Sequence, residues 1–315
     1  MKVLTWLDDA SAIVGDSVVA LGNFDGLHKG HQELIKETVK IAGQKGLSAL
    51  VFTFRNHPAN EIAGKTVVKN IMDIHEKSIV AERLGVEYMV NIRFDKMIMK
   101  MEPEEFVKRV LVKNLHIRHA VCGFNYNFGY KGMGNPALLA EYGKKYGFDV
   151  TVVPEYAIDG QTVSSTYIRE LISDGNMKRY EQFTGRTYKI GGYVMHGQHF
   201  GRTMGFPTAN LNLSQDMVLP VNGVYVTNII IDGKKYHSVT NVGNKPTVGE
   251  FDKNAETHIF DYNGDIYGKR VIVEFIDILR PEKKFDSQEE LAAQIDRDCI
   301  HAREYHQNIG NRTED

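Results

Sequence analysis

Apolar runs of strand length alternate with segments of helical spacing in the first half of the chain. Strands are predicted at 17–21, 47–54, 88–92, 120–123 and 150–153, and helices at 32–42, 74–84, 103–115 and 136–146. Strands that alternate with helices are typical of an α/β fold with a doubly wound parallel sheet. Because such sheets bind ligands at the carboxyl ends of their strands, we expect the chemistry in the loops that follow the strands.

The pattern changes after residue 184, where short strand-like runs with hairpin signals replace the alternation. Asp232-Gly233 separates the runs 224–231 and 235–242, and Asn263-Gly264 separates the runs 257–262 and 271–278. Dipeptides of this kind form two-residue turns between antiparallel strands. Regular short strands of this type predict a small antiparallel β-barrel.

A final helix is predicted to begin at Ser287, because Glu290 three residues later completes a capping box. Its apolar positions Leu291, Ile295 and Cys299 recur at helical spacing and should be buried. The chain is therefore expected to form two domains, an α/β domain at 1–184 and a β-barrel domain with a C-terminal helix at 185–315.

The length, net charge and apolar stretches of the chain exclude some classes of protein. The chain has 315 residues, enough for two cores, and its net charge of -2 gives no general electrostatic reason to bind nucleic acid or an anionic membrane. The N-terminal segment turns acidic at Asp8 before a signal-peptide core could form, and no apolar stretch approaches the length of a membrane span. We therefore expect a cytoplasmic protein, whose oligomeric state the sequence leaves open.

The two cysteines, Cys122 and Cys299, lie in different predicted domains. This count and placement support neither a disulfide framework nor a zinc site. Both are expected to be buried or bystander thiols.

The first strand-to-helix turn carries the most distinctive chemistry, in the segment Gly22-Asn23-Phe24-Asp25-Gly26-Leu27-His28-Lys29-Gly30-His31. A helix N-terminus attracts phosphate because it presents free N–H groups and the positive end of the helix dipole. His28 and His31 are one helical turn apart and can face the same phosphate chain, and Gly30 leaves room for a nucleotide. Histidines at this spacing also occur as a metal-binding pair or as solvated side chains, and these alternatives stay open here.

Two further loops follow predicted strands of the first domain. The loop at 53–58 contains His57, which could bind a ligand or be a loop histidine without a role. The loop at 123–129 contains Asn125, Tyr126 and Phe128, and aromatic faces with amide groups suit a flat flavin or adenine ring. The same aromatic side chains could instead cap the edge of the sheet.

A third loop, at 163–169, opens a helix with hydroxyl groups and a guanidinium. Ser164 and Thr166 could be simple helix caps. Arg169 near the same helix start favours an anion-binding site over simple helix caps, because a guanidinium beside hydroxyls and free N–H groups binds anions.

One loop of the second domain combines glycines with hard oxygen ligands. Its residues for wrapping a polyphosphate are Gly201, Arg202, Gly205 and Pro207. In an extended segment, Thr208 and Asn210 project to the same side, where a hydroxyl and an amide oxygen could bind Mg²⁺ carried by ATP. By composition alone, a glycine-rich loop with no ligand is an equal alternative.

The first domain resembles a known family. Its H-x-G-H string is similar to the signature of the nucleotidyltransferase superfamily, and the longer G-x-F-D-G-x-H-x-G-H resembles the flavin adenylyltransferase module of bacterial riboflavin kinase/FAD synthetase. The string at 164–169 is similar to the S-S-T-x-I-R motif of the same family. The resemblance implies catalytic roles for His28, His31 and Arg169, ATP contacts at Gly22, Phe24, Asp25, Gly30, Ser164 and Thr166, and flavin contacts at Asn125, Tyr126, Phe128 and His57.

Two positions depart from that family pattern. Asn56 stands where a proline usually precedes the His-Pro pair, and Asn127 stands where a basic residue is common. The first departure puts the loop conformation in question, and the second puts one phosphate contact in question.

The second domain resembles riboflavin kinases. The segment 201–210 matches G-x-x-x-G-x-P-T-A-N without a break, and the segment from Glu256 resembles the acidic strand whose glutamate takes a proton from the ribityl hydroxyl. This resemblance makes Glu256 the candidate base, with an exposed strand glutamate as the alternative, and it makes Arg280 a candidate flavin contact.

The resemblance runs from about residue 22 to about residue 298 and implies a bifunctional enzyme. The barrel would phosphorylate riboflavin with ATP and Mg²⁺ to give FMN, and the α/β domain would adenylylate FMN to FAD with release of pyrophosphate. Two alternatives are an enzyme with only one active half and a flavin-binding regulator without turnover. No nucleic acid and no membrane are expected among its partners.

Overall fold

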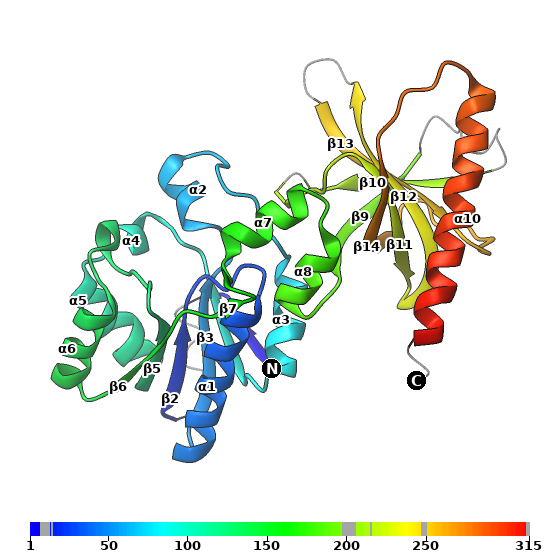
Figure 1. Cartoon of the computed structure of the whole chain (residues 1–315). Helices are drawn as coiled ribbons and strands as arrows, with labels where there is room; N and C mark the ends of the chain where they lie inside the picture. Colours follow the sequence, from blue (N-terminus) through cyan, green and yellow to red (C-terminus); the bar gives the residue numbers. More distant parts are fainter. Residues whose placement is uncertain (7–12, 14, 197–205, 215, 247–250, 313–315) are drawn as a thin grey trace. The chain divides into compact units, whose positions relative to one another are not determined.

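The computed structural model describes residues 1–312 except 7–12, 14, 197–205, 215 and 247–250 (Figure 1). The chain forms two compact units, residues 1–165 and 166–315. The predicted domain boundary between 184 and 185 stays a prediction.

The N-terminal unit is built on a six-stranded sheet whose neighbouring strands are all parallel. Its order is β1-β4-β3-β2-β5-β6, with β1 Lys2–Leu4, β2 Ser17–Leu21, β3 Ser48–Phe54, β4 Tyr88–Ile92, β5 Ile117–Gly123 and β6 Asp149–Val153. The prediction of a doubly wound parallel sheet is therefore confirmed. The short edge strand β1 was not predicted.

Both faces of this sheet are buried, because alternate residues of β2 belong to different apolar clusters. Val18 and Ala20 pack with side chains of α1 and α3, whereas Val19 and Leu21 pack with side chains of α5, η2 and α6. The bounds of the helices are α1 Lys29–Lys45, α2 Pro58–Ala63, α3 Ile74–Arg83, α4 Lys96–Met99, α5 Pro103–Phe106, α6 Pro136–Tyr146, the π-helix η2 Val107–Asn114 and the 3-10 turn η3 Tyr130–Gly132. The helix predicted at 103–115 thus forms as an α-helical turn that continues in π geometry.

The second unit contains a closed six-stranded antiparallel barrel, as predicted. Its strand order is β10-β13-β12-β11-β14-β9, with β9 Tyr188–Met195, β10 Thr208–Leu213, β11 Gly223–Ile231, β12 Lys234–Pro246, β13 Phe251–Ile259 and β14 Arg270–Pro281. Two helices precede the barrel along the chain, α7 Ser165–Ser173 and α8 Met177–Thr184, and α10 Gln288–Arg312 follows it. A two-stranded hairpin, β7 Ala157–Ile158 with β8 Gln161–Thr162, lies before α7.

One predicted hairpin of the barrel is confirmed and the other is wrong. β11 and β12 pair across the Asp232-Gly233 turn, where both residues have positive φ, 50° and 78°. The dipeptide Asn263-Gly264 instead lies in the connection between β13 and β14, which do not pair with each other. β14 pairs with β11 and β9, because closing the barrel places it between those strands.

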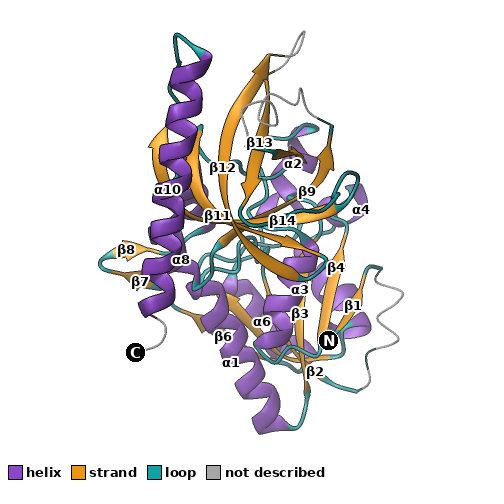
Figure 2. Ribbon diagram, turned by 90° about the vertical axis from the view of Figure 1, so that its right-hand side faces the viewer, coloured by secondary structure: helices purple, strands orange, loops and turns teal. Residues whose placement is uncertain are grey.

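Helix α10 begins where the capping signal predicts and packs along the barrel (Figure 2). The Ser287 hydroxyl oxygen accepts a hydrogen bond from the N–H of Glu290 at 3.1 Å. Cys299 and Ala302 are buried against Val224 and Val226 of β11. Leu291 and Ile295, which were expected to be buried, are half-buried and face a cavity of the barrel unit.

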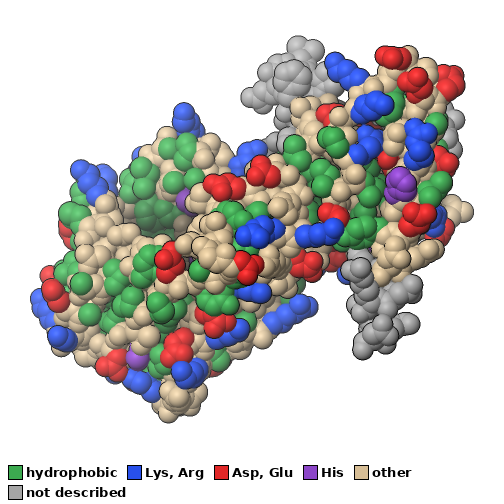
Figure 3. Space-filling model, viewed as in Figure 1, with side chains coloured by type: hydrophobic (Ala, Val, Ile, Leu, Met, Phe, Trp, Pro, Cys, Tyr) green, Lys and Arg blue, Asp and Glu red, His purple; other side chains and the backbone are tan. Residues whose placement is uncertain are grey.

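Two structural observations bear on the broad class of protein. Among the residues that the structure describes, no helix is long and apolar enough to cross a membrane. Positive and negative side chains are interspersed over the face seen in Figure 3.

Candidate functional site

The H-x-G-H histidines meet at the start of α1. His28 is the N-cap residue, and its Nδ1 accepts a hydrogen bond from the N–H of His31 at 3.2 Å. The two imidazole rings stack with centroids 3.6 Å apart and an angle of 14°, and the Phe24 ring meets His31 edge-on at 5.3 Å. The structure thus brings together the two side chains that the sequence assigned to the phosphates of ATP.

Within the part of the chain that the structure describes, no side-chain cluster suited to a metal joins the histidines. Among the described residues, no group of three or more His, Cys, Asp or Glu side chains could hold a metal ion. This finding gives no support to the alternative of a metal-binding pair at His28 and His31.

The loop between β2 and α1 has an unusual backbone that is tied to the rest of the unit. Phe24 and Leu27 have positive φ, 47° and 36°, although neither is glycine, and both side chains are buried. The carbonyl of Asn23 accepts hydrogen bonds from Thr53 Oγ1 at 2.8 Å and from Lys77 Nζ at 3.2 Å. Sequence analysis missed both donors, because no local signal links them to a loop 30 and 54 residues away.

Hydrogen bonds to Asp25, from Ile71 and from Ser165 at the start of α7, also hold this loop. The Asp25 carboxylate is buried and accepts the N–H of Ile71 at 3.0 and 3.3 Å. The carbonyl of Asp25 accepts a hydrogen bond from Ser165 Oγ at 2.8 Å. Among the contacts described here, Asp25 thus anchors the loop, and its predicted contact with ATP stays a prediction.

An apolar cavity of about 450 Å³ opens beside the histidines. It joins the ends of β2, β3 and β5, and its walls include His31 and the predicted flavin residues Asn125, Tyr126 and Phe128. The Tyr126 and Phe128 rings are stacked, with centroids 5.7 Å apart. Figure 3 shows hydrophobic side chains gathered around a hollow of the N-terminal unit.

The cavity has the shape and chemistry of a site for a flat ring. Its walls are mostly aromatic and aliphatic, and the amides of Asn23, Asn125 and Asn127 supply polar groups. Asn127, which departs from the family pattern, donates through Nδ2 to the carbonyl of Asn125 at 3.0 Å. It therefore supports the loop rather than adding a positive charge.

His57 caps a helix at the rim of this cavity. Its Nδ1 accepts the N–H of Ala59 at 3.2 Å at the start of α2, whose Pro58 and Ile62 line the cavity. Asn56, which replaces the usual proline, exchanges two hydrogen bonds with the main chain of Phe94, at 2.8 and 3.0 Å. The predicted flavin contact of His57 stays a prediction.

The remaining predicted residues of the N-terminal site lie at the start of α7. Ser164 precedes the helix, whereas Thr166 and Arg169 lie on the helix, in the second unit. The neighbouring Ser165, which sequence analysis did not single out, makes the hydrogen bond to the loop that carries Asp25. The roles of Ser164, Thr166 and Arg169 stay predictions.

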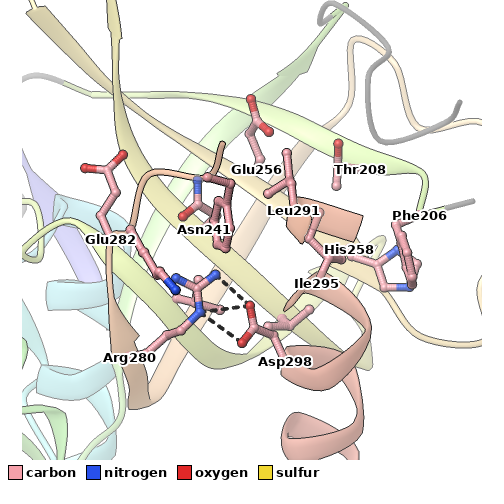
Figure 4. Close-up of a pocket in the computed structure, with 14 residues that line it drawn as sticks. Phe206, Thr208, Asn241, Glu256, His258, Arg280, Glu282, Leu291, Ile295 and Asp298 are labelled. Atoms are coloured by element: carbon pink, nitrogen blue, oxygen red, sulfur yellow. Dashed lines mark hydrogen bonds and ion pairs between the residues drawn. The ribbon is translucent and has the colours of Figure 1, made fainter. Parts of the chain in front are cut away.

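In the barrel, Glu256 faces a cavity of about 350 Å³ (Figure 4). Glu256 on β13 lies opposite Asn210 of β10 and Asn241 of β12, and His258 lies opposite Thr208. Thr208, Asn241 and Glu256 all line this cavity. The strand register therefore places the candidate base next to the candidate metal ligands.

Thr208 also borders a second cleft, of about 390 Å³, together with Pro207 and Asn210. Thr208 is thus shared by two hollows, one containing Glu256 and the other lined by Tyr262 and Tyr267. Thr208 and Asn210 both border the second cleft, and their predicted role as magnesium ligands stays a prediction. The predicted phosphate residues Gly201, Arg202 and Gly205 lie outside the described residues.

Arg280 forms one wall of the Glu256 cavity, but its guanidinium is engaged by a carboxylate. It donates to Asp298 of α10 through Nε at 3.0 and 3.1 Å and through Nη2 at 2.8 Å. Asp298 is buried and also accepts a hydrogen bond from Gln294 at 2.9 Å. Sequence analysis missed Asp298, whose partner lies 18 residues away on another element.

Comparison with known proteins agrees with this division of the sites. The FAD synthetase family matches residues 11–167, and the riboflavin kinase family matches residues 184–306. A bifunctional riboflavin kinase/FMN adenylyltransferase of Haemophilus influenzae is 33% identical over 306 residues, which cover 97% of this chain and 99% of that protein. The chain belongs to this family.

A second relative and a solved structure are similarly close to this chain. The protein of that name from Listeria monocytogenes is 36% identical over 285 residues, 90% of either chain. A crystal structure from Streptococcus pneumoniae, named a macrolide-efflux protein, matches with a TM-score of 0.86 and 34% identity over 96% of this chain and 99% of that one. The match to the Haemophilus influenzae protein covers 97% of this chain and therefore extends through both units.

Proposed function

We propose that the chain makes FMN from riboflavin in its barrel unit and FAD from FMN in its N-terminal unit, with ATP as the donor in both steps. The observation that carries this proposal is the match to the bifunctional family along 97% of the chain. In the N-terminal unit, a helix N-terminus suited to phosphate lies beside an aromatic cavity. In the barrel unit, Glu256 lies beside the hydroxyl and amide oxygens that could bind a metal ion. The assignment of residues to steps is our own proposal.

In the N-terminal unit, the phosphate of FMN attacks the α-phosphorus of ATP, and pyrophosphate leaves. The nucleophile is already an anion at neutral pH, so the protein needs to orient the reactants and neutralise charge rather than remove a proton. His28, His31 and the N-terminus of α1 would contact the phosphates. The isoalloxazine ring of FMN would occupy the cavity beside Asn125 and Tyr126.

In the barrel unit, the 5′-hydroxyl of riboflavin attacks the γ-phosphorus of ATP, the bond from that phosphorus to the bridging oxygen breaks, and ADP leaves. This nucleophile is a neutral alcohol, so a base that accepts its proton assists the reaction. Glu256 lines the cavity, and we assign it that role. The flavin ring would then lie against the apolar wall that includes Leu291 and Ile295 of α10.

The residues of β10 fit a magnesium ion that arrives with ATP. Thr208 and Asn210 are two residues apart on one strand, so their hydroxyl and amide oxygens project to the same side, and both border a cleft. When bound, Mg²⁺ supplies charge neutralisation at the phosphates. Thr208 and Asn210 would hold it beside the Glu256 carboxylate, which lies opposite Asn210.

The direct test supplies each substrate separately. The purified chain is incubated with riboflavin, ATP and Mg²⁺, and then with FMN, ATP and Mg²⁺, and the flavins are separated by chromatography. Formation of FMN in the first reaction and of FAD in the second supports the proposal. FAD or FMN alone would indicate a single active half, and unchanged flavins in both reactions would indicate a binding protein without turnover.

A further inference from the structure

A buried lysine lies beneath the loop that carries the H-x-G-H motif. Lys77 of α3 is 7% exposed, and its Nζ donates a hydrogen bond to the carbonyl of Asn23 at 3.2 Å. Lysine is rarely buried to this extent without a partner that offsets the loss of water. Burial lowers the pKa of Lys77, whereas attraction to the Asp25 carboxylate raises it. Burial of Lys77 therefore lowers the stability of the fold, and stability does not explain why a lysine occupies this position.

The surrounding contacts show what this lysine holds. The segment from Ile71 to Lys77 supports the loop at three places. Ile71 donates its N–H to the Asp25 carboxylate, and the Ile71 side chain lies where a Cβ at Gly26 would come within 2.9 Å. The third contact is the hydrogen bond from Lys77 to Asn23.

The contact at the Asn23 carbonyl determines the direction in which the N–H of Phe24 points. The peptide between Asn23 and Phe24 is trans, so the N–H of Phe24 points away from the carbonyl that Lys77 and Thr53 hold. Phe24 itself has the strained φ of 47°, a conformation that persists only when neighbouring contacts enforce it. Asn23 and Phe24 also line the cavity beside His31, whereas Lys77 does not.

We propose that Lys77 is a positioning residue for adenylyl transfer, whose ammonium group holds the main chain at Asn23 and Phe24 in the conformation that binds the phosphates of ATP. This inference rests on the proposed FMN adenylylation in the N-terminal unit. Thr53 acts on the same carbonyl without a charge.

The decisive variant is Lys77→Met, which removes the ammonium and keeps a long apolar side chain. We expect the kcat of FAD formation from FMN to fall at least tenfold, with a change of less than twofold in the KM for FMN, because Lys77 does not line the cavity. FMN formation from riboflavin, measured on the same preparation, stays at the wild-type rate. Lys40→Met, at an exposed position of α1, is the matched control and leaves both rates unchanged.

Further variants separate positioning from general damage to the fold. Lys77→Arg keeps the charge and should retain more activity than Lys77→Met. Thr53→Val should also lower kcat, and its effect combined with Lys77→Met should differ from the product of the two single effects, because both residues hold one carbonyl. Independent effects of the two variants would overturn the proposal.

The outcomes distinguish this inference from the function on which it rests. If the wild-type chain forms no FAD, the proposed adenylylation fails. If the wild type forms FAD and Lys77→Met has the same kcat, or changes only the KM for FMN, the role of Lys77 fails. Should Lys77→Met leave the N-terminal unit unfolded while kinase activity persists, Lys77→Gln takes its place, and a wild-type kcat in that variant overturns the proposal.

Discussion

His28 and His31 stack their imidazole rings at a centroid distance of 3.6 Å, while Nδ1 of His28 caps the helix that begins at Lys29 and carries His31. His28 therefore combines a structural contact with the chemistry proposed for the site. Replacement by alanine removes both, whereas replacement by asparagine keeps a side chain that caps helices well.

We predict that His28→Ala lowers the rate of FAD formation at least tenfold, equivalent to about 1.4 kcal/mol of transition-state stabilisation. His28→Asn should lose as much activity and keep the thermal stability that His28→Ala reduces, because the asparagine retains the cap. FMN formation stays unchanged in both variants. His75→Ala, at an exposed position of the same unit, is the control, and a wild-type FAD yield in His28→Asn would contradict a chemical role for the ring.

Glu256→Gln should separate the two activities. Loss of the carboxylate base lowers FMN formation by about 100-fold or more, because the ribityl hydroxyl keeps its proton. FAD formation from supplied FMN should continue at the wild-type rate, as measured by chromatography of each reaction. Glu289→Gln, on the exposed first turn of α10, should leave both rates unchanged. Loss of both activities in Glu256→Gln would refute separate sites.

Arg280→Met tests whether the guanidinium supports the cavity wall or contacts the flavin. Removing it leaves the buried Asp298 carboxylate without its bidentate partner, so we expect a loss of about 3 kcal/mol in the free energy of unfolding of the barrel unit. Urea denaturation measures this loss. Lys269→Met breaks an exposed ion pair with Asp232 and should cost about 1 kcal/mol or less. A raised KM for riboflavin with unchanged stability would instead favour a flavin contact.

The attachment of α10 to the barrel should depend on pH through His306. This side chain is buried, donates through Nε2 to the carbonyl of Thr227 at 3.1 Å, and stacks on His237. Burial, followed by the proximity of His237, lowers the pKa of His306 to about 4 from 6.5. Because the folded state resists protonation, its stability is complete above about pH 6.5 and falls as the pH drops toward about 4.

The expected loss is on the order of 3 kcal/mol in the free energy of unfolding across that range. Measured as urea midpoints between pH 7 and pH 4, the loss should be smaller in His306→Gln than in the wild type. His301→Gln, at an exposed position of the same helix, should retain the wild-type dependence. An equal slope in wild type and His306→Gln would assign the acid sensitivity to other groups.

Local signals in the sequence were sufficient to predict much of the fold. The alternation of strands and helices, the cap at Ser287 and the Asp232-Gly233 turn all depend on neighbouring residues, and the structure confirms them. The first helix, which was predicted at 32–42, begins earlier, at Lys29. The two-residue period of a strand likewise predicted that Thr208 and Asn210 share one side of β10, and both border the same cleft.

Features set by distant residues were not predictable in the same way. Asn263-Gly264 has the composition of a hairpin turn, but closure of the barrel decides which strands pair, and β13 and β14 are separated by β12 and β11 in the strand order. Lys77 occupies an ordinary position in a helical pattern, and only the fold brings it beneath a loop 54 residues away. The Arg280–Asp298 pair similarly depends on how α10 lies on the barrel.

The amide of Asn56 bridges the segments that follow β3 and β4. The side-chain amide both donates to and accepts from the main chain of Phe94, as the main chain of a paired β-strand residue would, and Phe94 lines the aromatic cavity. A proline would stiffen the unfolded chain as well as the folded one, whereas this amide acts only after the two strands have come together. The rim of the aromatic cavity is therefore held by two hydrogen bonds from one amide, and breaking them would exchange two internal hydrogen bonds for bonds to water.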